Sequence, residues 1–233
     1  MEKRKRAGMT VFQMTLGALY VALFALAGNV PVLSAIQIIP GVPITLQVFL
    51  VAMMGLTLGV RGGLMSYAAV LILTLCGLPM MAGGKGGLPV FIGPTCGYIY
   101  GWVFIVILTG LYSTYAMDRL IRRPLGRAVS EAEASKSAGV FRRALDKLLR
   151  MSIHLPASFA VGMLGVCLDY LCGSAALAAI GGKGLHEIPA LLLSNLAFVP
   201  GDMIKIGLAS ALSLSLFAGP AFSRFFAARR VCS

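Results

Sequence analysis

Two residues of opposite charge, Asp202 and Lys205, interrupt a long apolar stretch of the sequence. Charge is costly to place inside a membrane, so it favours a binding or transport role. Residues three apart share a face of a helix, where the two can pair and form a polar anchor in a ligand cavity. Pro200 and Gly201, immediately before Asp202, should weaken the helical hydrogen bonding and expose backbone groups toward a cavity. The alternative is a self-neutralising pair that only holds helices together.

Asp169 is a third charge inside an apolar stretch. It could complete a network with Lys205, or it could face another helix in a purely structural role. No paired-carboxylate or nucleophile motif accompanies it, so no catalytic residue is expected and the chain is predicted not to be an enzyme. An intramembrane enzyme that uses Asp169 and Asp202 is the alternative from a different functional class.

The two histidines, His154 and His186, have no partners at the spacing of metal ligands or of a catalytic pair. We expect both to lie near the membrane interface. The sequence therefore predicts no metal site and no cofactor.

A glycine-rich segment at residues 83–87 has almost no side chains to block a close approach to its backbone. Its amides could surround an anion or a carbonyl group, and Lys85 at its centre could attract a negatively charged ligand. A flexible turn, with Lys85 keeping it in water, is the alternative. The spacing of a phosphate-binding loop is absent. The candidate ligand-binding residues of this segment are Gly83, Gly84, Lys85, Gly86 and Gly87.

Small residues at Ala18 and Ala22 lie four apart on one face of the first apolar stretch. Such faces allow helices to approach closely in a membrane. The face could pack inside the protein, or it could be the docking surface for a partner protein.

The elements that must position these residues are membrane-spanning helices. Hydrophobic residues make up 58% of the chain, charged residues 12%, and the mean hydropathy is +0.90, which leaves too little charge to cover a soluble domain. Because a crossing takes roughly 20 apolar residues, the chain is predicted to be an all-α, six-helix membrane bundle in one domain, 1–233. The predicted spans are residues 9–27, 44–60, 64–78, 97–117, 153–180 and 188–217.

The chain has a formal net charge of +12, and most of its basic residues lie outside the predicted spans. Basic residues concentrate at both termini, at Arg61 and in the connection 118–150, so the positive-inside rule predicts cytoplasmic termini. Residues 140–150 of this connection are expected to form a short amphipathic helix at the interface. No readout motif accompanies the charge, so contact with the lipid bilayer is favoured and nucleic acid is not an expected partner.

Four segments of the chain, taken in order, resemble the BioY family, the biotin-specific S components of energy-coupling-factor (ECF) transporters. The resemblance extends over nearly the whole chain, and its glycine loop and its PGDxxK stretch are the most specific parts. The matching segments are PITLQ at 43–47, GGKGG at 83–87, FIGPTCGY at 91–98 and PGDMIK at 200–205.

The resemblance implies a substrate-binding subunit in a prokaryotic cytoplasmic membrane that binds biotin at its extracellular side, under a lid formed by the first loop. It also implies docking through Ala18 and Ala22 onto a membrane coupling protein that works with two ATP-binding subunits. Asp202 and Lys205 then hold the ureido group, while the glycine loop with Lys85 meets the carboxylate; the reverse placement is physically possible. Gln47 and Tyr98 are further candidates for lining the cavity.

Two alternatives share this membrane architecture. The chain could be an S component for another vitamin, such as thiamine or riboflavin, or a biotin carrier that works without the ATPase module. Binding assays with the other vitamins address the first, and uptake in cells that lack the coupling proteins addresses the second.

Overall fold

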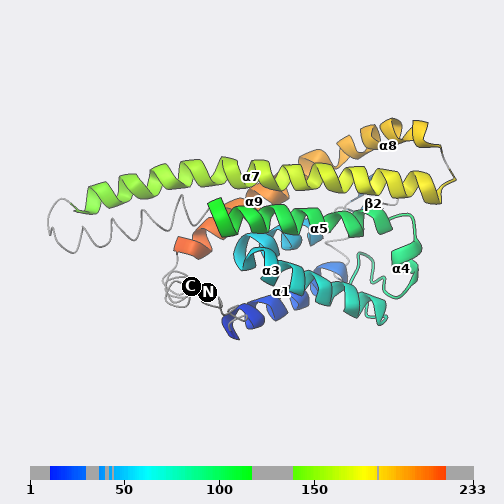
Figure 1. Cartoon of the computed structure of the whole chain (residues 1–233), viewed down its shortest axis with the longest axis horizontal. Coiled ribbons are helices and arrows are strands. Elements are labelled where there is room, and N and C mark those ends of the chain that lie inside the picture. The colour runs from blue at the N-terminus through cyan, green and yellow to red at the C-terminus, as the bar shows by residue number, and fades with distance from the viewer. Residues whose placement is uncertain are drawn as a thin grey trace, which may run out of the picture.

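A computed structural model describes residues 11–29, 37–39, 42–43, 45–116, 139–182 and 184–218 of the chain. It is built almost entirely of helices (Figure 1), with one short antiparallel pair of strands in the segment predicted to be a loop. The elements in order are α1 Val11–Asn29, β1 Gln37–Ile39, β2 Val42–Pro43, α3 Gln47–Leu75, α4 Pro89–Ile92, α5 Cys96–Leu111, a π-helical turn Tyr112–Ala116, α7 Gly139–Ile180, a 3₁₀ turn Leu185–Glu187, α8 Ile188–Ser194, a 3₁₀ turn Asn195–Ala197 and α9 Val199–Ala218.

Helix α3 is a hairpin of two arms. Gly59 has φ 73° and ψ −176° inside it, a conformation that only glycine adopts at little cost. The chain reverses there, because a Cβ on Gly63 would lie 3.3 Å from the Cα of Gly55, whereas eight residues of a straight helix span roughly 12 Å. Consistently, Gln47 at the start of α3 hydrogen-bonds beyond its end, with Nε2 3.0 Å from the carbonyl oxygen of Met80. The predicted break at residues 61–63 therefore lies at Gly59 instead.

Helix α5 lies between α3 and α7, α9 packs against α3 and α7, and α1 packs against α3. Trp102 of α5 is at the centre of this arrangement. Its ring centroid lies 5.8 Å from that of Phe24 in α1 and 6.5 Å from that of Tyr67 in α3, both in edge-to-face geometry, which aromatic pairs prefer. These three buried rings join α1, α3 and α5 into one core.

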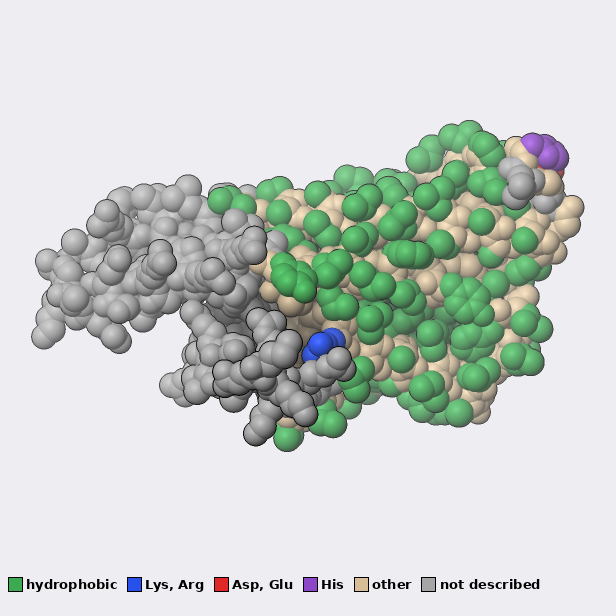
Figure 2. All heavy atoms as spheres, viewed as in Figure 1, with side chains coloured by type: hydrophobic (Ala, Val, Ile, Leu, Met, Phe, Trp, Pro, Cys, Tyr) green, Lys and Arg blue, Asp and Glu red, His purple; other side chains and the backbone are tan. Residues whose placement is uncertain are grey.

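The described surface is largely hydrophobic in the view of Figure 2, as expected of a protein whose outside faces lipid. Five of the described helices are long and apolar enough to cross a membrane: Val11–Asn29, Gln47–Leu75, Cys96–Tyr115, Ile153–Ile180 and Val199–Leu216. This agrees with the predicted class of helical membrane protein.

Two predicted elements differ from the structure. The amphipathic helix expected at 140–150 is not separate, because α7 runs without interruption from Gly139 to Ile180. The last predicted span, 188–217, is broken into α8 and α9 by the 3₁₀ turn Asn195–Ala197. The break that Pro200 and Gly201 suggested thus lies earlier in the chain, and Pro200 occupies the first turn of α9, where its missing N–H costs little.

The close contact between α3 and α5 gives a stability prediction. A Cβ on Gly55 would lie 2.8 Å from the carbonyl oxygen of Val106, and this backbone atom cannot rotate away. We expect Gly55→Ala to destabilise the protein by about 1–3 kcal/mol, the usual cost of overpacking, measured as a lower thermal unfolding temperature in detergent. Gly207→Ala is the matched control, because its nearest neighbours are ring atoms of Phe159 at 4.0 Å. Equal stability of the two variants would contradict the close packing.

Candidate functional site

Asp202 and Lys205 form the paired site that their spacing predicted. They lie at the start of α9, with Nζ of Lys205 2.9 Å from Oδ1 of Asp202. Tyr170 of α7 donates a hydrogen bond to the other carboxylate oxygen, at 2.6 Å. Asp202 is only 5% exposed and Lys205 9%. A buried carboxylate with two bonded oxygens is held in one orientation, so its remaining lone pairs can be presented to a ligand in fixed directions.

Asp169 lies close to this pair, on α7 beside Tyr170. It is 3% exposed, and its Oδ1 atom is buried without a hydrogen-bond partner. Asp169 and Asp202 are near enough to interact electrostatically. The network with Lys205 that the sequence suggested is not formed directly, because within the described residues the only ion pair of Lys205 is with Asp202.

A second polar group links three elements near the start of α5. Tyr98 donates to Oδ1 of Asn195 at 2.8 Å, and Nδ2 of Asn195 donates to Oγ of Ser174 at 2.9 Å. The Tyr98 ring packs against Gly173, where a side chain would collide with it. Asn195 stands in the turn before α9, so these bonds fix where α9 begins and therefore where Asp202 lies.

Gln47 and the glycine loop form a third group. Gln47 is 2% exposed, and its side-chain amide donates to the carbonyl of Met80. The N–H groups of Gly83 and Gly84 both donate to the carbonyl of Gly28, at 3.1 and 3.3 Å. The loop is thereby fastened to the last turn of α1.

The amides of the loop are largely occupied by the protein itself. Besides those of Gly83 and Gly84, the N–H of Lys85 donates to Met81 at 3.2 Å and that of Gly87 to Thr74 at 2.7 Å. A ligand carboxylate that uses these amides must therefore displace protein carbonyls. The Lys85 side chain is exposed and can meet an anion without such a change.

The three groups stand at the starts of different helices. Tyr98 lies in the first turn of α5, Asp202 in the first turn of α9, and Gln47 begins α3. In Figure 1 the end of the bundle beyond the glycine loop carries α4, while α1 starts at the opposite end. A side chain on Gly101 would collide with Asp169, and one on Gly173 would collide with the Tyr98 ring, so the close contact of α5 with α7 places the second group beside Asp169. No hydrogen bond or ion pair among the described residues joins Gln47 or the loop to Asp202.

Sequence reasoning missed Tyr170, Asn195 and Ser174. Tyr170 directly follows Asp169, and Asn195 is an amide inside a predicted span, where an unpaired polar group is costly. Asp202 was identified because it is a polar residue inside an apolar span, and the same criterion could have identified Asn195. Ser174 carries no such signal, since serine bonds readily to its own helix.

Comparison with known proteins decides the family. The sequence matches the BioY family over residues 1–219. The chain belongs to the BioY family. Among its relatives are the biotin transporter BioY of Rhizobium etli, 31% identical over 211 residues that cover 91% of this chain and 96% of the relative, and the biotin transporter BioY of Rhodobacter capsulatus, 30% identical with 83% and 86% covered.

The fold of this BioY-family chain is similar to a solved structure as well. The crystal structure of the S-component for biotin from an ECF-type ABC transporter matches it with a TM-score of 0.65 at 29% identity, over 94% of this chain and 100% of that chain. The likeness covers nearly the whole of both chains, so it concerns the overall arrangement of the helices.

In this BioY-family chain Ala18 and Ala22 are exposed, on the face of α1 that points away from the bundle. The opposite face is buried: Gly17 lies against Ser66, and the Tyr20 hydroxyl lies 3.0 Å from that of Thr57. Their exposure favours the docking surface over internal packing against the described part of the chain. A docking surface stays a prediction.

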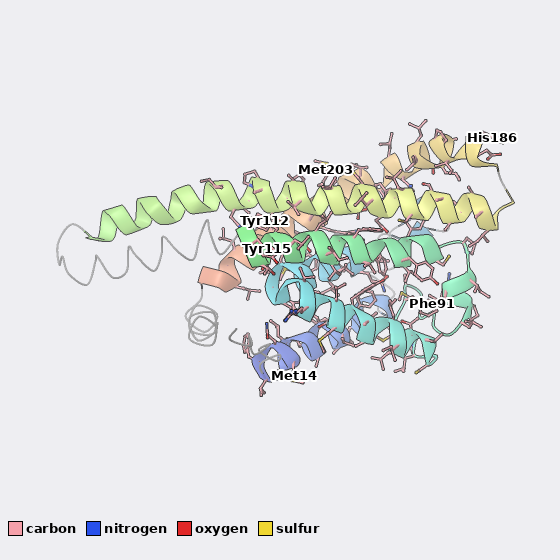
Figure 3. The ribbon with its side chains drawn as sticks, viewed as in Figure 1. Met14, Phe91, Tyr112, Tyr115, His186 and Met203 are labelled. Carbon is pink, nitrogen blue, oxygen red and sulfur yellow. The ribbon has the colours of Figure 1, made fainter. Side chains whose placement is uncertain are left out.

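The two histidines have different surroundings. His154 is fully buried, with Nδ1 2.9 Å from the Tyr112 hydroxyl and Nε2 3.4 Å from that of Ser213, so it has partners that the sequence spacing did not suggest. That both lie near the membrane interface stays a prediction. His186 is exposed near the other end of α7, far from Tyr112 in Figure 3. Within the described residues, no three His, Cys, Asp or Glu side chains come together as a metal site would require.

Proposed function

We propose that this chain captures biotin for uptake as the S component of an ECF-type ATP-driven transporter. The observation that carries the proposal is the buried Asp202–Lys205 pair, found in a chain whose family relatives are named biotin transporters. A desolvated acid–base pair selects strongly for a ligand that satisfies both of its members, since any other ligand leaves them unpaired.

The chemistry of biotin suits this pair. Its ureido group has two N–H donors and one carbonyl acceptor, and its ring and chain are apolar. In the proposed complex, Asp202 accepts an N–H and Lys205 donates to the carbonyl. The buried Gln47 and the half-buried Tyr98 line the cavity. The loop Gly83–Gly84–Lys85–Gly86–Gly87 meets the carboxylate, with the exposed Lys85 as its charged contact.

The proposed topology has six crossings and cytoplasmic termini. It counts the two arms of α3 as separate crossings, which is supported by the bond from Gln47 to Met80 and by the chain reversal at Gly59. Arg61 directly follows that reversal, and the positive-inside rule favours the cytoplasm for it. The end that carries Gln47 and the glycine loop is then extracellular.

The proposed partners are a membrane coupling protein and two ATP-binding subunits, in the cytoplasmic membrane of a prokaryote. ATP hydrolysis resides in those partners. The exposed pair Ala18 and Ala22 supports this assignment, because small residues on an outer helix face allow a second helix to approach closely.

Lys85 gives a test of how biotin is oriented. If its ammonium meets the ligand carboxylate, Lys85→Met should weaken biotin binding by about tenfold, a value within the range for hydrogen bonds to charged groups. Biotin amide, which lacks the negative charge, should bind the variant and the parent protein alike. Equal weakening of both ligands would argue for the reversed placement of biotin.

Uptake of labelled biotin tests the proposed function. A bacterial strain without its own biotin transport is given this chain alone, the coupling proteins alone, or both. Uptake that requires both supports an S component. Uptake by the chain alone would identify a self-sufficient carrier, and no uptake in any strain would contradict the proposal.

A further inference from the structure

The buried carboxyl of Asp169 has no evident structural task. Its Oδ1 atom is shielded from solvent and lacks a hydrogen-bond partner among the described residues. An unsatisfied buried polar atom is expensive. A ligand that donates to this oxygen would remove the cost.

The backbone around Asp169 is shaped to hold the carboxyl in place. Gly101 of α5 faces it, and a Cβ there would lie 2.8 Å from the Cα of Asp169. The glycine thus lets α5 and α7 approach closely and fixes the carboxyl between them. The next residue along α7, Tyr170, donates to Oδ2 of Asp202 at 2.6 Å, so Asp169 lies beside the Asp202–Lys205 pair.

The hydrogen-bonding capacity of a ureido ligand exceeds what the Asp202–Lys205 pair supplies. The two N–H groups of a cyclic urea stand on opposite edges of the ring and point in diverging directions, so one carboxylate cannot accept both. The oxygens of Asp202 also bond Lys205 and Tyr170. A second acceptor is required, and each N–H left unpaired in a desolvated site would cost affinity.

We propose that Asp169 is this second acceptor and a specificity-determining residue for the ureido group. It accepts one N–H, Asp202 accepts the other, and Lys205 donates to the carbonyl between them. The inference rests on the proposed function, because it takes biotin to be the ligand. Asp169 of α7 and Asp202 of α9 then lie at opposite edges of one ligand ring.

Equilibrium binding to the purified full chain in detergent tests the proposal, with biotin and two cyclic carbamates in which a ring oxygen replaces one or the other N–H. The parent protein should bind each carbamate at least about tenfold more weakly than biotin, since a ring oxygen offers a carboxylate no donor. Asp169→Ala should bind biotin about tenfold more weakly than the parent does. This variant should bind one carbamate as tightly as it binds biotin, and should bind the other carbamate more weakly by the same factor as the parent protein does.

Three outcomes would overturn the inference. They are unchanged biotin binding by Asp169→Ala, equal further losses with both carbamates, and a parent protein that tolerates the carbamate on the Asp169 side. If the alanine variant does not fold, Asp169→Asn takes its place, because its amide keeps one acceptor and should show a smaller loss confined to the same carbamate. Failure of the parent protein to bind biotin at all would instead contradict the proposed function.

Discussion

Asp202→Asn is expected to weaken biotin binding on the order of 100-fold or more. The substitution keeps the size of the side chain but removes its charge, which leaves Lys205 buried without a counter-ion. The ligand loses a hydrogen bond to a charged acceptor, which contributes up to about 3 kcal/mol, and each 1.4 kcal/mol is about a factor of ten in Kd. The unpaired Lys205 lowers the stability of the folded protein in addition. Titration of the purified variant with labelled biotin measures the loss.

Two further variants separate ligand recognition from the loss of structure. Tyr170→Phe removes a single hydrogen bond to Asp202 and should cost about 1 kcal/mol or roughly fivefold in Kd. Asp202→Asn combined with Lys205→Met removes both charges, so its thermal stability should recover although its biotin binding should not. If Asp202→Asn folds and binds biotin as tightly as the parent, the ureido assignment is wrong.

Ala18→Trp and Ala22→Trp are expected to abolish ATP-driven biotin uptake while leaving biotin binding unchanged. Both side chains are exposed on the outer face of α1, so a larger residue there meets lipid in the isolated protein and costs it little. In a complex, the same residue would keep two helices apart that small residues allow to pack. Uptake into cells and binding in detergent are measured in parallel.

Leu208→Trp is the matched control for these docking variants. Leu208 is also exposed, but on α9, so the variant places the same tryptophan on another outer surface. Uptake should stay normal in this variant. Loss of uptake in the control, or normal uptake in both alanine variants, would contradict a docking role for α1.

The helices were predictable from sequence where composition alone determines them. The spans at Val11–Asn29 and Cys96–Tyr115 agree with the predicted 9–27 and 97–117 within two residues, because long apolar segments in lipid can only be helical. The reversal within α3 was predicted in kind but misplaced by two to four residues. Arg61, Gly62 and Gly63 look like a turn, yet the turn is formed by Gly59 alone, whose positive φ depends on packing against α5.

The site was predictable where a residue type conflicts with its surroundings. Asp202 and Lys205 were identified because their charges stand in an apolar stretch, and helical spacing predicted that they pair. The bond from Tyr170 and the burial of His154 depend on how α7 packs against α5 and α9, which no local pattern encodes. The occupied amides of the glycine loop likewise depend on its docking to α1.

Equilibrium binding of labelled biotin to the purified parent chain in detergent, in competition with unlabelled biotin, thiamine and riboflavin, tests the central claim most directly. We expect saturable binding that unlabelled biotin displaces and the other two vitamins do not. Absence of biotin binding by well-folded protein, or displacement by thiamine or riboflavin at similar concentrations, would contradict it.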